Sequence, residues 1–356
     1  MKRIGNLYKQ IISIENLRIA DKKARKGKKK TYGVRLHDKN RDANILALHE
    51  ALLTKSFKTS EYDVFKIYEP KERIIYRLPY YPDRILHHAI MNVLEPIWIS
   101  VFTHNTYSSI KKRGIHKCAR YVKKIIRKYE GKPLYCLKID IKKFYPSIDH
   151  EVLKSIIRKK IKDEDLLWLL DEIIDSTDGV PIGNYLSQFF ANLTLCYLMH
   201  NLNEVQHVYC TEYADDIVLF SDSKDKLRGL FFGVLKPHIE KELKLRVKEN
   251  YQIFPIAENR QDNNGRALDY VGYKFFRKQT LLRKRTKKNF CRKVAKLSKQ
   301  NITPLEFKKG ISSWIGWTKY CNSKHLLHTI IPKNYESILQ SKAPNIRGSR
   351  KRKLSV

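Results

Sequence analysis

Three aspartates have the types and spacing to bind divalent cations. Asp215 and Asp216 are adjacent, in the tetrapeptide Tyr213-Ala214-Asp215-Asp216 between two β-prone runs, and Asp140 ends a separate run (YCLKID). Adjacent carboxylates repel each other unless a cation neutralises them. Carboxylate oxygens suit Mg²⁺, and two such ions about 4 Å apart can activate an attacking oxygen and stabilise a leaving phosphate. The pattern indicates nucleotidyl transfer.

The Y-x-D-D tetrapeptide is a weak signal by itself. It should arise by chance in about one chain in twenty of this length and tyrosine content, and an Asp pair in a turn is usually only a turn. The order of the surrounding motifs is more informative. Along the chain come LKIDIKKFYPSIDH, GVPIGNYLSQ, YADDIVLF and LDYVGYKF, each with apolar runs beside it.

Regular elements must hold these motifs in place. We expect a strand over Tyr135–Ile141, a helix capped by Asp149, and a second helix in EDLLWLLDEII. The loop GVPIGN should start a long helix, because apolar residues recur at helical spacing after it: Leu186, Phe190, Leu193 and Tyr197. Val208–Phe220 should form two β runs joined at Ala214-Asp215, and DYVGYKF a further strand.

The two ends of the chain are basic. Residues 1–60 are predicted to be helical, and their basic patch Lys22–Lys30 is either a solvated loop or a phosphate contact. Short β-prone runs follow over Tyr62–Tyr80, then a helix near Pro82. Beyond Leu281 the composition predicts basic helices to about Leu339, and from residue 343 a disordered tail.

Composition narrows the class of partner. The chain has 72 Lys and Arg against 36 Asp and Glu, a net charge of +36, spread along its length, which favours nucleic acid over a membrane surface. No run approaches 18 apolar residues and no signal peptide is apparent, so we expect an intracellular, cytoplasmic protein. The six cysteines lie far apart without a C-x-x-C pair, which predicts reduced, mostly buried thiols.

These motifs, in this order, resemble reverse transcriptases from about Tyr62 to Asn289. RIIYRLPYYPDRILHHAI and FTHNTYSSIKKRGIHKCARYV resemble the fingers blocks, and LKIDIKKFYPSIDH resembles the palm block. The resemblance implies an α/β (α+β) right-hand polymerase with an antiparallel palm sheet. Its expected regions are a basic helical extension (1–60), fingers (61–134), a palm (135–280, with inserted helices at 150–178), a helical thumb (281–342) and the basic tail (343–356).

The resemblance also implies roles for single residues. Asp140, Asp215 and Asp216, with the backbone carbonyl of Ile141, would hold two Mg²⁺ ions, for which Mn²⁺ is a possible substitute. Tyr145 would lie under the incoming sugar and exclude a 2′-hydroxyl, whereas Phe144 is expected in the core. The expected contacts to the incoming dNTP or template are Arg73, Arg77, Tyr145, Gly183 and Gln188. For Arg73 and Arg77 a solvated strand face is the alternative, and for Gly183 a helix-entry turn.

The block Ile182-Gly183-Asn184-Tyr185-Leu186-Ser187-Gln188 departs from the usual bacterial Q-G-x-x-x-S-P. This I-G-x-x-x-S-Q form resembles diversity-generating retroelement enzymes of bacteria and phages, as do KENYQIFPI and LLRKRTKKNF. Those enzymes copy a template-repeat RNA with errors at adenines, and a small basic accessory protein assembles with them as a pentamer. The expected partners are therefore template RNA, a DNA or RNA primer, dNTPs and that protein. Ile182 and Gln188 would relax base selection.

Two alternatives stay open. One is a reverse transcriptase of another bacterial lineage, such as a retron, group II intron or defence type, against which Gln188 and the lack of an evident maturase region argue. The other is a catalytically idle RNA-binding protein that uses the same basic surface. The presence of all three aspartates and Tyr145 disfavours the second alternative.

Overall fold

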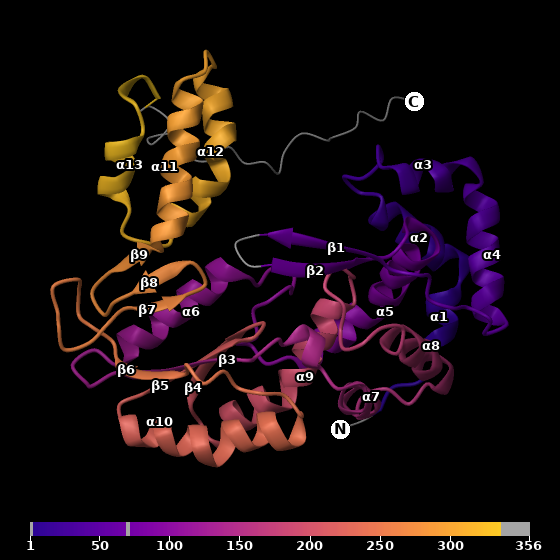
Figure 1. Ribbon diagram of the computed structural model, residues 1–356, viewed down its shortest axis with the longest axis horizontal. Helices are drawn as coiled ribbons and strands as arrows, with labels where there is room; N and C mark the ends of the chain where they lie inside the picture. The colour runs from indigo at the N-terminus through magenta and orange to yellow at the C-terminus, as the bar shows by residue number, and fades with distance from the viewer. Residues whose placement is uncertain (1–2, 69–71, 336–356) are drawn as a thin grey trace, which may run out of the picture. The chain divides into compact units, whose positions relative to one another are not determined.

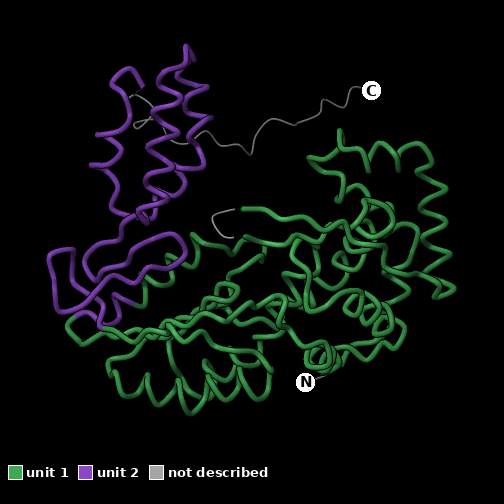
Figure 2. The backbone as a smooth tube through the Cα atoms, viewed as in Figure 1, with its two compact units in different colours: residues 1–125, 131–254 green, residues 126–130, 255–356 purple. Residues whose placement is uncertain are grey.

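The computed structural model describes residues 3–68 and 72–335, which form two compact units (Figures 1 and 2). Unit 1 contains residues 1–125 and 131–254, and unit 2 contains residues 126–130 and those from 255 onward. The predicted tail at 343–356 lies outside the described residues, as does the end of the predicted C-terminal helical segment. Among the described helices, none combines the length and apolar character needed to span a bilayer.

Unit 1 begins with four helices, as predicted: α1 Tyr8–Ile12, α2 Ile14–Ala24, α3 Tyr32–Lys39 and α4 Arg41–Leu53. The apolar residues of α4 recur at helical spacing, and Ile45, Leu48 and Leu52 are all buried. Ser13 caps α2 by accepting a hydrogen bond from the backbone N–H of Asn16. The side chains of these helices join the main hydrophobic core of unit 1.

A two-stranded hairpin and a long helix follow. β1 Asp63–Tyr68 and β2 Glu72–Arg77 are antiparallel, with Asp63 opposite Arg77. A π-helical turn, η1 Tyr80–Arg84, then leads into α5 Ile85–Val101. The predicted β-prone runs and the helix near Pro82 are both confirmed. α5 packs against α2 because one of its faces is apolar throughout.

A four-stranded sheet lies at the centre of unit 1, in the order β4-β5-β3-β6. Its strands are β3 Tyr135–Asp140, β4 Tyr209–Tyr213, β5 Asp216–Ser221 and β6 Gln252–Pro255. β5 is antiparallel to both β3 and β4. Its continuous apolar run, Ile217 to Phe220, is fully buried, which is typical of a strand covered on both faces. The strands predicted around the aspartates are confirmed.

The helices that follow α5 along the chain, up to β6, are α6 Ile115–Lys128, α7 His150–Arg158, α8 Glu164–Ile174, α9 Ser187–His200 and α10 Lys224–Leu230. Shorter turns are η2 Tyr145–Ser147, η3 Asn201–Val205, η4 Phe231–Leu235 and η5 His238–Glu242. Asp149 caps α7, as predicted, by accepting a hydrogen bond from the N–H of Val152 at 2.9 Å. α10 packs against β3 and β5.

Unit 2 combines a small sheet with helices. Its strands are β7 Leu268–Tyr270, β8 Tyr273–Phe275 and β9 Thr280–Leu282. Its helices are α11 Lys284–Ser298, α12 Pro304–Thr318, α13 Lys324–Ile330 and the 3₁₀ turn η6 Lys333–Tyr335. Phe290, Phe307 and Ile311 form their core, and Trp314 packs against it. The predicted C-terminal helices are confirmed over the residues described.

The prediction of a single strand in DYVGYKF is wrong. The segment is a hairpin in which Val271 and Gly272 form the turn between the paired residues Tyr270 and Tyr273. Val271 has φ 41°, a conformation that β-branched residues rarely adopt, so the sequence did not indicate a turn there. Gly272 has φ 83°, and a Cβ there would lie 2.4 Å from the Trp317 ring.

The cysteines agree with the sequence prediction. All six are free, four are buried, and the remaining two, Cys291 and Cys321, are partly buried. Burial raises the pKa of the Cys196 and Cys210 thiols to about 12, so both remain protonated and unreactive.

Candidate active site

The Tyr213-Ala214-Asp215-Asp216 motif is a tight hairpin. Tyr213 at the end of β4 pairs with Asp216 at the start of β5, so Ala214 and Asp215 form a two-residue turn. Ala214 has φ 55°, a left-handed conformation that costs a non-glycine residue about 1 kcal/mol. The predicted turn position is confirmed, and the hairpin places two carboxylates at one end of the sheet.

The third aspartate reaches the same end from the neighbouring strand. Asp140, the last residue of β3, is directly opposite Asp216 of β5 in the antiparallel register. The backbone N–H of Ile141 donates a hydrogen bond to the carbonyl of Asp215 at 3.3 Å. Directly opposed residues have Cβ atoms roughly 5 Å apart. The sheet therefore brings together the three aspartates that the sequence singled out, although Asp140 precedes Asp215 by 75 residues along the chain.

The electrostatics of this cluster are unfavourable for three negative charges. Burial, followed by the charges of Asp140 and Asp216, raises the pKa of Asp215 to about 6, and Lys248 lowers it partly. A carboxyl shifted in this way takes up its charge more readily beside a cation. The like-charge crowding is thus a physical reason for a cation at this end of the sheet.

Two lysines that sequence reasoning missed contact the cluster. The Nζ of Lys248 lies 2.5 Å from Oδ1 of Asp140, and the Nζ of Lys138 lies 3.5 Å from Oδ1 of Asp216. Lys138 precedes Asp140 by two residues on β3, so strand alternation puts both on one face, a signal available in the sequence. Lys248 is 108 residues from Asp140, and no local pattern indicates the contact.

The donor set fits Mg²⁺ by its chemistry, because all the candidate side-chain ligands are carboxylate oxygens. Over residues 3–68 and 72–335, no group of three His, Cys, Asp or Glu side chains converges tightly enough to enclose an ion. Instead, Asp140 and Asp216 each lie against a lysine ammonium group. Metal ligation would therefore need the aspartate side chains to turn from their lysine partners.

Tyr145 lies beside the aspartates. A turn through Lys143 (φ 47°) follows β3 and leads to the 3₁₀ turn that begins at Tyr145. Burial and then the charge of Asp215 raise the pKa of the Tyr145 hydroxyl to about 12, while Arg73 lowers it. Tyr145 is thus within electrostatic range of both Asp215 and Arg73. Phe144 is 3% exposed and belongs to the core, as predicted.

The two candidate arginines of β2 differ in their surroundings. The guanidinium of Arg77 is bonded to the carboxylate of Asp63 and lies 5.3 Å from the centroid of the Phe65 ring. Arg73 is exposed and contributes to the electrostatic environment of Tyr145. The structure therefore brings Arg73, but not Arg77, toward the aspartate cluster.

The segment before α9 is fixed to β2. The N–H of Tyr76 donates a hydrogen bond to the carbonyl of Ile182 at 2.9 Å. Gly183 has φ 128°, and a Cβ there would lie 2.7 Å from the carbonyl oxygen of Tyr76. The close approach at Gly183 is thus to the β2 backbone. Gln188, in the first turn of α9, is exposed, and Ile182 is partly exposed.

Glu212, which the sequence did not indicate, lies just before the hairpin and is completely buried. Its carboxyl group accepts a hydrogen bond from the Thr106 hydroxyl at 3.1 Å, and its backbone bonds to Asn105 and Tyr107. The guanidinium of Arg113 donates to the carbonyls of Thr103 and Thr106 in the same loop. The loop from Thr103 to Arg113 therefore supports the strand that carries the Tyr213-Ala214-Asp215-Asp216 motif.

Comparisons with known proteins agree with this arrangement. Residues 69–252, more than half of the chain, match the family described as reverse transcriptase (RNA-dependent DNA polymerase). The retron Ec73 reverse transcriptase of Escherichia coli is 28% identical over 202 residues, which cover 49% of this chain and 60% of that protein. The protein YkfC of E. coli K12 is 26% identical over 145 residues, 36% of this chain and 38% of that one.

Among solved structures, telomerase from Candida tropicalis, in complex with a fragment of telomeric RNA, is similar with a TM-score of 0.47 at 13% identity. The match covers 83% of this chain and 56% of the telomerase chain. The chain spans only part of the length of each of these relatives.

The protein has a mixed α/β fold with an antiparallel central sheet, as the sequence predicted for a right-hand polymerase. It belongs to the reverse transcriptase family.

Proposed function

We propose that this chain is an RNA-directed DNA polymerase with its catalytic centre at Asp140, Asp215 and Asp216. The supporting observation is the register of the central sheet, in which Asp140 is opposite Asp216 and next to the Asp215 turn. Nucleotidyl transfer needs this concentration of carboxylates. A purely RNA-binding role gives no account of three carboxylates brought together in a chain of net charge +36.

The three carboxylates and the carbonyl of Ile141 would hold two Mg²⁺ ions, or Mn²⁺ in their place. When bound, such ions lower the pKa of the attacking hydroxyl and neutralise charge on the triphosphate. Lys248 and Lys138 form ion pairs with Asp140 and Asp216 at the end of the sheet. The protein's own contribution is thus three carboxylates gathered at one end of the sheet, with two lysines that occupy Asp140 and Asp216 until an ion binds.

Tyr145 and Arg73 would orient the incoming nucleotide. The Tyr145 ring, near Asp215, would lie under the sugar and exclude a 2′-hydroxyl by its bulk. Arg73 would bind the triphosphate, since a guanidinium matches phosphate geometry. We assign Arg77 a smaller role in triphosphate binding, because Asp63 already neutralises it.

Primer extension on an RNA template with Mg²⁺ tests the polymerase assignment. Asp215→Ala and Asp216→Ala should each lower the extension rate by at least about a thousandfold, while RNA binding persists. Asp222→Ala is the matched control, because Asp222 follows the opposite end of β5 and should leave the rate unchanged. Extension by the Asp215→Ala variant at the wild-type rate would show that the assignment is wrong.

We further propose that the enzyme copies a template-repeat RNA with errors at adenines, for transfer into a variable repeat of a target gene. The support is the I-G-x-x-x-S-Q block, in which Ile182 replaces a hydrogen-bonding Gln and Gln188 replaces Pro. The hydrogen bond from Tyr76 fixes the backbone at Ile182, so its side-chain chemistry can influence base selection. A small basic protein assembled as a pentamer would be its partner in the bacterial cytoplasm.

The fidelity of two variants tests this assignment. Ile182→Gln should lower misincorporation opposite template adenine by about three- to tenfold, because one restored hydrogen bond is worth about 1 kcal/mol. Leu186→Met, a change in a buried apolar residue of the same block, is the control and should leave the error spectrum unchanged. Unchanged misincorporation in Ile182→Gln would contradict the fidelity role.

The second candidate function is that of a retron or group II intron reverse transcriptase, which the similarity to the retron Ec73 enzyme favours. The genomic neighbourhood separates the two. A template repeat nearly identical to the end of an adjacent gene, but differing at adenines, would support the retroelement. The absence of such a repeat would favour a reverse transcriptase of another bacterial lineage.

A further inference from the structure

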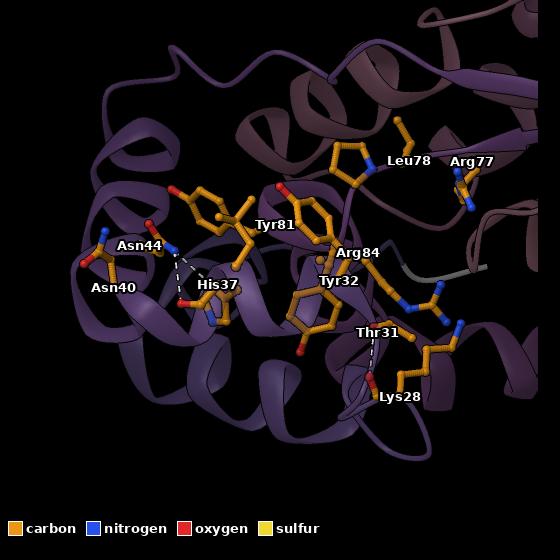
Figure 3. A pocket seen from close by; sticks show the side chains of 14 residues that line it. Lys28, Thr31, Tyr32, His37, Asn40, Asn44, Arg77, Leu78, Tyr81 and Arg84 are labelled. Atoms are coloured by element: carbon orange, nitrogen blue, oxygen red, sulfur yellow. Dashed lines mark hydrogen bonds between the residues drawn. The ribbon is translucent and has the colours of Figure 1, made fainter.

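A cavity of about 690 Å³ lies within unit 1, away from the three aspartates (Figure 3). One wall is α3 with the turn before it, including Lys28 and Tyr32, and the other is the connection from β2 to α5, including Arg84. Ligand sites typically have volumes of about 300–1,000 Å³. The cavity is therefore large enough for a nucleotide unit.

Two cations face this cavity without an acidic partner. The ends of the Lys28 and Arg84 side chains approach each other in Figure 3, and within the described part of the chain neither forms an ion pair. The Nε of Arg84 is buried and has no hydrogen-bond acceptor there. Burial lowers the pKa of both groups, and the charge of Arg84 lowers that of Lys28 further. Two like charges that approach each other, one of them partly buried, are unfavourable until an anion joins them.

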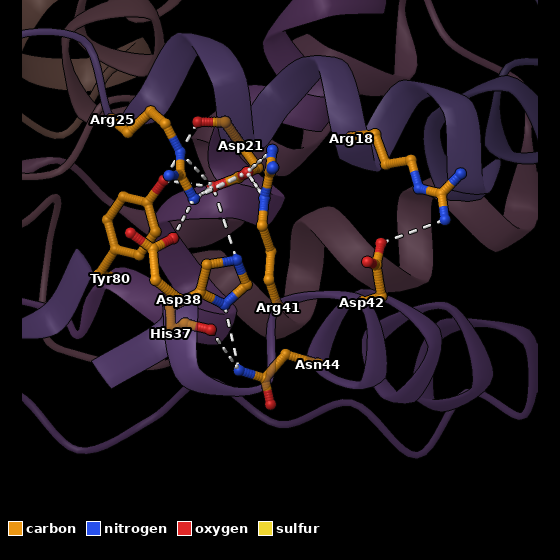
Figure 4. A network of polar contacts seen from close by, with 9 residues as sticks. All are labelled: Arg18, Asp21, Arg25, His37, Asp38, Arg41, Asp42, Asn44 and Tyr80. Atoms are coloured by element: carbon orange, nitrogen blue, oxygen red, sulfur yellow. Dashed lines mark hydrogen bonds and ion pairs between the residues drawn. The ribbon is translucent and has the colours of Figure 1, made fainter. Parts of the chain in front are cut away.

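Arg25, directly after α2, and Arg41, at the start of α4, are neutralised within the protein. Asp21, which is completely buried, lies 2.9 Å from the guanidinium of Arg25 and 2.6 Å from that of Arg41 (Figure 4). It also accepts a hydrogen bond from the Tyr80 hydroxyl at 2.5 Å. A Cβ on Gly33 would lie 3.0 Å from Cβ of Tyr80. This network fixes one wall of the cavity against the other. Of the three Lys and Arg side chains that line the cavity, Arg77 is paired with Asp63, which leaves Lys28 and Arg84 without an ion pair among the described residues.

Aromatic rings complete the site. The Tyr32 side chain lines the cavity and is 81% exposed. The Tyr81 ring, on the opposite wall, stacks on His37 with a centroid distance of 5.6 Å. Exposed aromatic rings beside unpaired cations are the elements with which proteins bind single strands, through base stacking and phosphate contacts.

We propose that this cavity binds an unpaired nucleotide of a single-stranded nucleic acid, with its phosphate between Lys28 and Arg84 and its base on Tyr32. A free triphosphate carries about four negative charges and would be poorly neutralised by two cations. A phosphodiester carries one charge and matches the site better. The inference rests on the proposed function, because that function identifies the strand as template RNA that has not yet reached the catalytic centre.

Photocrosslinking tests this contact in the full-length chain. A 5-iodouridine-substituted single-stranded RNA should crosslink to Tyr32, and peptide mass spectrometry would locate the adduct. Lys28→Gln and Arg84→Gln should each lower the yield at Tyr32 at least about fivefold, because each removes a phosphate contact. Lys39→Gln is the matched control, since Lys39 is an exposed lysine of α3 that does not line the cavity. A thermal melt of each variant confirms that it is folded.

The outcomes are distinguishable from those of the polymerase assay. The inference would be overturned if RNA bound without forming a Tyr32 adduct, or if Lys28→Gln left the crosslink yield at Tyr32 unchanged. Neither outcome would affect the primer-extension result. Loss of the adduct in excess dATP, with RNA still bound, would show a site for free nucleotides and would also overturn it. If the chain formed the Tyr32 adduct but extended no primer, the strand contact would be supported and only the polymerase assignment would be contradicted.

Discussion

The backbone N–H of Tyr76 donates a hydrogen bond to the carbonyl of Ile182 at 2.9 Å, and this bond joins β2 to the segment that precedes α9. The β2 strand carries Arg73, and the segment carries Gly183. A residue proposed to bind triphosphate and the variant block proposed to set fidelity are therefore mechanically coupled. Movement of β2 must displace the segment before α9, because the two are joined through their backbones.

Gly183→Ala should destabilise this junction. A Cβ at position 183 would lie 2.7 Å from the carbonyl oxygen of Tyr76, and the backbone has φ 128°. Strain of this kind costs about 1–3 kcal/mol. We expect a lower free energy of unfolding in urea and slower primer extension. The KM for dNTP should change by a larger factor than kcat.

Gly229→Ala is the control for this change. Gly229 lies within α10, where the backbone is helical, and a Cβ added to it would have nothing within 4 Å. Alanine should stabilise that helix by up to about 1 kcal/mol. If both variants have the wild-type free energy of unfolding, the backbone contact at Gly183 does not constrain the segment.

Much of this arrangement could be predicted from the sequence, because its signals are local. Apolar runs predicted β3 and β5, and Asp149 marked the start of α7 by its capping chemistry. The contact of Lys248 with Asp140 could not be predicted, because it joins residues 108 positions apart. Glu212 was missed because β4 is buried on both faces, which removes the alternation that distinguishes inward from outward residues.

Lys248→Met should strengthen metal binding at the aspartate cluster. The Nζ of Lys248 lies 2.5 Å from Oδ1 of Asp140 and competes with any cation for that oxygen. Removing a partly exposed charge of this kind changes the binding energy by about 0.5–1 kcal/mol, or two- to fivefold. The Mg²⁺ concentration at half-maximal thermal stabilisation should fall by that factor, a readout independent of catalysis.

Lys244→Met provides the comparison, because the Lys244 ammonium pairs with Asp149, the cap of α7, at 3.0 Å. It should leave the Mg²⁺ dependence unchanged. Equal shifts in the two variants would mean that general surface charge, and not the contact with Asp140, controls the affinity.

Glu212 should make the stability of the fold depend on pH. Burial raises the pKa of its carboxyl from 4.5 to about 8, opposed by the Thr106 hydrogen bond and the charge of Arg113. Between these values the unfolded chain releases the proton and the folded chain keeps it, so the free energy of unfolding falls as pH rises. The total loss should be roughly 5 kcal/mol, with no further change above about pH 8.

Glu212→Gln should remove this dependence, since the amide resembles the protonated carboxyl and does not titrate. Urea unfolding at about pH 5 and pH 8.5 should show a smaller fall in the free energy of unfolding for the variant than for wild type. Glu61→Gln, at an exposed position, should retain the wild-type profile. A Glu212→Gln variant with the same pH slope as wild type would mean that Glu212 is already ionised in the fold.

Asp21→Asn should be the most destabilising of these substitutions. Burial opposes the charge of Asp21, but hydrogen bonds from Tyr80, Arg25 and Arg41 lower its pKa below the ordinary value. The Asn side chain would leave Arg41 without a balancing charge and Arg25 with Asp38 alone. Breaking a buried ion pair in this way costs about 3–5 kcal/mol. By contrast, Asp42→Asn breaks only an exposed pair with Arg18 and should cost at most about 1 kcal/mol. Urea unfolding measures both, and equal costs would mean that the Asp21 network does not hold the N-terminal helices to η1.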